Sequence, residues 1–102
     1  MNTTKLSDHE LLVHVQTAAA RERATLLEII RYFAEIERRK LYAAHHASMF
    51  EFATKALKMS EGQAQRRIDA ARVYRELPQI AEKLESGRLN LMHLSLARRY
   101  FR

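Results

Sequence analysis

A chain of 102 residues with a formal net charge of +6 is long enough for one compact domain, and its 47% hydrophobic content excludes wholesale disorder. The absence of cysteine excludes a disulfide framework and a thiolate metal or redox site. Two glycines and one proline leave few strand-and-turn signals, so we expect an all-α fold. The N-terminus lacks the apolar segment of a signal peptide, and no run approaches membrane-spanning length. We therefore expect a cytoplasmic protein.

The positive charge is unevenly distributed along the chain. Residues 1–35 hold four basic and five acidic side chains, whereas residues 36–102 hold fourteen basic and seven acidic ones. A concentration of positive charge in one part favours an anionic polymer as partner. A basic surface that is merely solvated remains the alternative.

The longest predicted helix spans residues 7–40. It begins at Ser7–Glu10, a capping-box pattern, and no glycine or proline follows before Gly62. At 1.5 Å per residue this helix is roughly 50 Å long, more than the remaining chain can cover. Glu22 is the one polar inner position of a seven-residue apolar repeat formed by Leu12, Val15, Ala19, Leu26, Ile29, Phe33 and Ile36. We expect residues 1–40 to be a dimerisation element that pairs two copies. A broken first helix that folds back into a bundle is the alternative.

Residues 41–102 are predicted to form a small helical domain. We expect a loop or frayed helix end over 41–47, then helices over 48–58, 60–77, 79–86 and 91–102. Ser48 and Ser60 each begin a capping box, and Gly87 suits a left-handed cap. The helix over 48–58 should bury Phe50, Ala53 and Leu57. The helix over 60–77 should bury Ala64, Ile68 and Ala71. Their short connection predicts a helix-turn-helix, which places its second helix in the major groove of DNA.

The candidate DNA-binding residues lie on and before the helix predicted over 60–77. Arg66 could bind guanine O6 and N7, and Gln65 could bind adenine or phosphate. Gly62 allows close approach of the backbone, while Ser60 and Gln63 suit phosphate oxygens at the helix start. The remaining candidates would attract phosphate independently of sequence: Lys55, Lys58, Arg67, Arg72 and Arg75. We expect their arginines to share one continuous basic surface.

Lys58 occupies the predicted turn, where a left-handed backbone often requires glycine. A lysine there would cost roughly 1 kcal/mol, so a different turn geometry is a possibility that the sequence leaves open. The five histidines show no metal-ligand spacing, and no nucleophile, phosphate-loop or dinucleotide motif is present. We therefore expect no cofactor, no metal and no enzymatic activity in this chain.

Five segments resemble the N-terminal helical region of bacterial HNH endonucleases: 37–42, 48–52, 60–72, 75–80 and 83–91. The resemblance covers roughly residues 35–102, and the stretch from Ser60 to Ile68 is its most specific part. The turn and the elements after it also loosely resemble the DNA-binding part of ParB-like partition proteins. Both resemblances imply a DNA-associated role, although Lys58 stands where the HNH family often has glycine. They do not imply catalysis, since the His-Asn-His residues of the nuclease are absent.

The sequence thus predicts a dimeric helix-turn-helix domain that binds double-stranded DNA, in the cytoplasm at the nucleoid. Two other hypotheses remain. In one, the heptad face makes the chain a protein–protein interaction module. In the other, the chain is the non-catalytic targeting region of a longer HNH-type nuclease.

Overall fold

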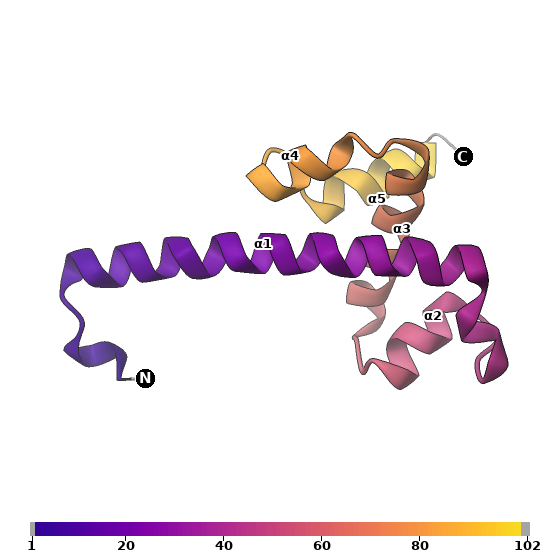
Figure 1. Ribbon diagram of the computed structural model, residues 1–102, viewed down its shortest axis with the longest axis horizontal. Helices are drawn as coiled ribbons and strands as arrows, with labels where there is room; N and C mark the ends of the chain where they lie inside the picture. The colour runs from indigo at the N-terminus through magenta and orange to yellow at the C-terminus, as the bar shows by residue number, and fades with distance from the viewer. Residues whose placement is uncertain (1, 101–102) are drawn as a thin grey trace.

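The computed structural model describes residues 2–100, and every regular element within them is helical. This confirms the all-α prediction. The long helix α1 and the shorter helices are joined by brief turns (Figure 1). The elements are η1 (Thr3–Lys5), α1 (Asp8–Arg39), η2 (Leu41–Ala44), α2 (Met49–Glu51), η3 (Phe52–Ala56), α3 (Glu61–Glu76), α4 (Ile80–Ser86) and α5 (Leu91–Tyr100).

Helix α1 is uninterrupted from end to end, so the alternative of a broken first helix is wrong. The Ser7 hydroxyl accepts a hydrogen bond from the Glu10 amide at 3.1 Å and caps the first turn. Lys40 ends the helix in a left-handed conformation with φ of 55°, and its amide donates to the last carbonyls.

Helix α3 is the central helix of the fold and crosses behind α1 (Figure 1). The predicted inner residues Ala64, Ile68 and Ala71 are all buried, and small alanines allow this close crossing. They join one hydrophobic core with residues of α1, including Ile30 and Phe33, and with residues of α2, α4 and α5. The core therefore crosses the domain boundary that was predicted after residue 40.

The segment before α3 is less regular than predicted. Residues 41–44 form a short 3₁₀ turn, and the helix expected over 48–58 consists of α2 followed by η3, a wider π-helical turn. Ala53 is fully buried, whereas Leu57 remains 44% exposed because the π turn ends before it. The prediction that Leu57 is buried was therefore wrong.

Helices α4 and α5 lie on the opposite side of α1 from α2 (Figure 1). Helix α4 packs against α1, and α5 packs against α3. Gly87 closes α4 with φ of 83°, as its predicted role as a left-handed cap requires. Arg23 Nε donates to the Glu85 carbonyl at 3.0 Å and ties the end of α4 to α1. The last predicted helix is described as far as Tyr100, and residues 101–102 of it lie outside the described part.

The N-terminal half of α1 projects beyond this packed body (Figure 1). Leu12 and Val15, both in the predicted heptad, are 61% and 57% exposed. The described chain extends over 49 × 29 × 20 Å. The prediction that the remaining residues are too few to cover the whole helix is confirmed.

Candidate nucleic-acid interface

The start of α3 is held by the capping box that the sequence predicts. The Ser60 hydroxyl accepts a hydrogen bond from the Gln63 amide at 3.2 Å, and Gln63 Oε1 accepts one from the Ser60 amide at 3.1 Å. Both side chains, which were candidates for phosphate contact, are thus engaged in forming the first turn. These two hydrogen bonds together fix the orientation of the first turn of α3 relative to the preceding chain.

The turn before α3 is left-handed at Lys58, with φ of 62°. The lysine therefore adopts the conformation that often requires glycine, and the alternative of a different turn geometry is wrong. The Met59 amide donates to the Ala53 carbonyl at 3.1 Å and closes the corner. The strain of about 1 kcal/mol expected for a non-glycine residue is offset by this closure and by the capping box that follows. The Lys58 side chain is exposed at the apex of the turn.

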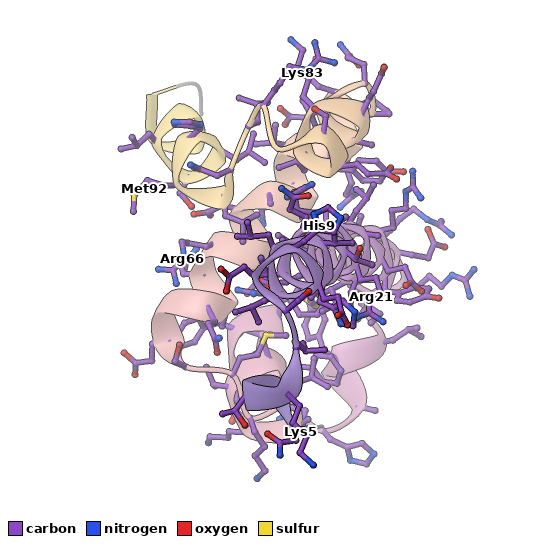
Figure 2. The ribbon with its side chains drawn as sticks, turned by 90° about the vertical axis from the view of Figure 1, so that its left-hand side faces the viewer. Lys5, His9, Arg21, Arg66, Lys83 and Met92 are labelled. Atoms are coloured by element: carbon purple, nitrogen blue, oxygen red, sulfur yellow. The ribbon has the colours of Figure 1, made fainter. Side chains whose placement is uncertain are left out.

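Arg66 and Gln65 lie on the side of α3 near α5, away from α1 (Figure 2). Arg66 folds back over Gly62, so that its Nη1 lies 3.0 Å from the position that a Cβ on Gly62 would occupy. Gln65 Nε2 donates to Asp69 Oδ1 at 3.0 Å. Glycine at position 62 thus leaves room for the Arg66 guanidinium over the first turn of α3, where the exposed amides are.

Arg67 lies on a different side of α3. Its Nη1 donates to the Gln63 carbonyl at 3.3 Å, and it lines a small hollow with Glu22 and Ile29 of α1. Burial lowers the pKa of Arg67, with a further contribution from the neighbouring positive charge of Arg66. Arg67 is thus turned toward α1, and Glu22 is its acidic neighbour there.

Arg72 and Arg75 lie toward the end of α1, where Glu37 binds both. Arg72 Nη2 lies 2.8 Å from Glu37 Oε2, and Arg75 Nη1 lies 3.8 Å from Glu37 Oε1. The hydrogen bonds to Glu37 raise the pKa of Arg72 above its ordinary value. The Glu37 side chain is only 17% exposed, and it draws both guanidiniums toward α1.

Lys55 is also paired within the chain. Its Nζ lies 3.0 Å from Glu51 Oε1. The pKa of Glu51 is lowered chiefly by a hydrogen bond from the Ala47 amide and also by Lys55. Glu51 was predicted as part of the Ser48 capping box, and the Ser48 hydroxyl does accept from the Glu51 amide at 3.0 Å.

The arginines of α3 therefore do not share one continuous basic surface, and that expectation is wrong. The physical reason is that α3 is packed by neighbours on several sides, which separates its arginines. The residues that remain together at the exposed start of α3 form what we call the α3 tip: Lys58, Ser60, Gly62, Gln63, Gln65 and Arg66. Within the described residues, neither Lys58 nor Arg66 has an ion-pair partner.

Sequence reasoning missed Glu37 as the acid that pairs with two arginines of α3, whose side chains remain 39% and 43% exposed. No local signal could identify it, because Glu37 and Arg72 are brought together only by the crossing of α1 and α3. The Gln65–Asp69 pair, by contrast, has the i, i+4 spacing of neighbours on a helix and could have been found.

Comparisons with protein-family models, with curated proteins and with solved structures find no match to this chain. Over residues 2–100, no helix combines the length and apolarity needed to cross a membrane. The same part of the chain brings together no group of three metal-ligating side chains.

Proposed function

We propose that this chain is a dimeric DNA-binding domain in which the α3 tip contacts the duplex. The observation that carries the proposal is the exposed start of α3, which the left-handed Lys58 sets at a sharp angle to η3, as in a helix-turn-helix. The amides of the first turn and the positive end of the 16-residue helix favour an anion there. Lys58 in the turn and Arg66 over Gly62 add two positive charges to this end of α3, and Glu61 of the first turn offsets one of them.

The α3 tip is small, so we expect weak, salt-sensitive binding from each copy. Two phosphate contacts give a slope near −2 for the logarithm of the association constant against the logarithm of salt concentration. Pairing of two copies through α1 would double the number of contacts on one duplex and raise the affinity through effective concentration. In a cell, such a protein would lie in the cytoplasm at the nucleoid.

The test is fluorescence anisotropy with a labelled random duplex at several salt concentrations. The Lys58→Ala/Arg66→Ala variant should bind about tenfold or more weakly and show a flatter salt response. The matched control, Lys83→Ala/Arg88→Ala, removes the same charge from α4 and the turn that follows it, and Figure 2 shows Lys83 at the top of the view, away from Arg66. Equal loss of binding in both variants would contradict a role for the α3 tip. Circular dichroism of both variants confirms that the helices are retained.

The second candidate function is a protein–protein interaction module. It is favoured by the exposed apolar residues of the N-terminal half of α1, which nothing in the described chain covers. In this case, wild-type protein would show no salt-dependent DNA binding, while association through α1 would persist. The resemblance to the N-terminal region of HNH endonucleases fits either function, as a targeting region or as an assembly region of a longer nuclease.

A further inference from the structure

One face of α1 carries a continuous row of side chains that runs from the bare N-terminal half into the packed C-terminal half. The intervals along this row alternate between four and three residues, which is the spacing of a coiled-coil seam. Leu11, Val15 and Tyr32 are 45%, 57% and 62% exposed. We call this row the α1 stripe: Leu11, Val15, Ala18, Glu22, Thr25, Ile29, Tyr32 and Ile36.

The C-terminal end of the α1 stripe forms one wall of an apolar groove of about 450 Å³. The other wall comes from the segment below α1 in Figure 1, through Phe52, Leu57 and Met59. At the N-terminal end of the stripe there is no second wall in the described chain. One end of α1 thus offers an apolar groove, and the other offers an uncovered apolar helix.

We propose that a second copy of this chain pairs with α1 in antiparallel direction, so that the bare end of each helix occupies the groove of the other. The inference rests on the pairing of two copies proposed above and adds its direction and register. The stripe is self-complementary in this direction, because residue numbers that sum to 47 face each other. The facing pairs are Leu11 with Ile36, Val15 with Tyr32, Ala18 with Ile29, and Glu22 with Thr25.

The polar residues of the stripe distinguish the two possible directions. In antiparallel register, Glu22 faces the Thr25 hydroxyl of the second copy, which can donate a hydrogen bond to the carboxylate. In a parallel, in-register pair, Glu22 would face a second Glu22 at the centre of the seam, and like charges would repel. A parallel pair would also place the two uncovered N-terminal halves beside each other, so that neither apolar groove would be occupied by the N-terminal half of the other copy.

Charge at the two ends of α1 favours the same direction. The first turn carries Asp8 and Glu10, and the last carries Arg38 and Arg39, followed by Lys40. Antiparallel pairing places the acidic end of each helix beside the basic end of the other and opposes the two helix dipoles. Arg38 and Arg39 also bind Glu35 of their own chain. Together with Lys40 they carry three positive charges against the single negative charge of Glu35, so this end of the helix stays positively charged.

The exposed surface is large enough to accommodate such a partner. The described chain exposes 7469 Å², whereas a compact protein of its mass exposes about 6,000 Å². Its radius of gyration is 16.1 Å, against about 13 Å for a compact domain of this length. A standard dimer interface covers about 800 Å² of each partner, which the surplus surface readily supplies.

Cysteine cross-linking tests the direction and register directly, because the native chain has no cysteine. The Val15→Cys/Tyr32→Cys variant should form a disulfide-linked dimer on mild oxidation, since both residues are exposed and face each other across the pair. They are 17 positions apart on one helix, about 25 Å, so no bond can form within a chain. Neither single variant should cross-link.

Cross-linking by the single variants would overturn the direction. A dimer by light scattering without a cross-link in any variant would overturn the register. A monomer at all concentrations would overturn the pairing itself, and DNA binding by the α3 tip would then still be measured separately.

A pair of aspartate substitutions tests which face is used. Val15→Asp should raise the dimer dissociation constant about tenfold or more, because it places a charge against Tyr32 of the second copy. Val13→Asp makes the same change two residues away, on an exposed position outside the stripe, and should alter the constant less than about threefold. Equal weakening by the two substitutions, measured by sedimentation equilibrium, would overturn the assignment of the stripe.

Discussion

The two halves of α1 have similar apolar repeats but different surroundings. In the C-terminal half, Ile30 and Phe33 are 0% and 2% exposed beneath α3 and its neighbours. In the N-terminal half, Leu12 occupies the heptad position equivalent to Phe33, and both Leu12 and Val15 remain mostly exposed. The repeat therefore specifies which face of the helix is apolar, whereas the amount of chain available to pack against it decides which part becomes core. Hydrophobic burial should contribute to folding only in the C-terminal half.

The largest expected effect is on the C-terminal half. Ile30→Ala should reduce the free energy of unfolding by about 2–5 kcal/mol, because it removes a fully buried side chain and leaves a cavity. The melting temperature should fall by about 10 °C or more. Urea denaturation followed by circular dichroism at 222 nm measures the change.

Val13→Ala in the N-terminal half is the matched control for this comparison. Val13 is 43% exposed and lies outside the α1 stripe, so its truncation should change stability by less than about 0.5 kcal/mol. If both alanine variants were destabilised to the same extent, the N-terminal half would be as well packed as the C-terminal half.

A smaller effect is expected where α1 binds the arginines of α3. Glu37→Gln should destabilise the fold by about 1 kcal/mol, since it leaves the Arg72 guanidinium, whose side chain is 39% exposed, without its charged partner. Chemical denaturation is again the measurement. Removing the other partner of the pair, by Arg72→Gln, should reduce the free energy of unfolding by a similar amount. The double variant should reduce it by less than the sum of the two single variants.

Much of the fold could be predicted from local patterns. The capping residues Ser7, Ser48 and Ser60 and the cap at Gly87 mark real helix ends, because these signals act within a few residues of the boundary. The buried face of α3 followed from the spacing of Ala64, Ile68 and Ala71. Each of these correctly predicted features, the helix ends and the buried face of α3, is determined by residues close together in the sequence.

The grouping of the candidate site could not be predicted in this way. Whether Arg66, Arg67 and Arg72 share a surface depends on how α1 and α5 pack around α3, and the helical pattern of α3 alone does not contain that information. The grouping of the arginines thus depends on contacts between segments that are distant in the sequence. The π turn that leaves Leu57 exposed is local, but the apolar spacing of residues 48–58 does not distinguish it from an α-helix.

The smallest effect concerns the last turn of α1, beyond the buried region, where Glu35 binds Arg38 and Arg39. Hydrogen bonds from Arg38, and then from Arg39, lower the pKa of Glu35 from 4.5 to about 2. Because the pKa is lower in the folded state, the stabilising contribution is present above pH 4.5 and is lost as the pH falls toward 2. An NMR titration of the Glu35 carboxyl should show its midpoint rise toward 4.5 in Arg38→Gln and remain unchanged in Arg21→Gln, which alters a distant arginine of the same helix. An unchanged midpoint in Arg38→Gln would mean that this exposed pair forms too rarely in solution to stabilise the end of α1.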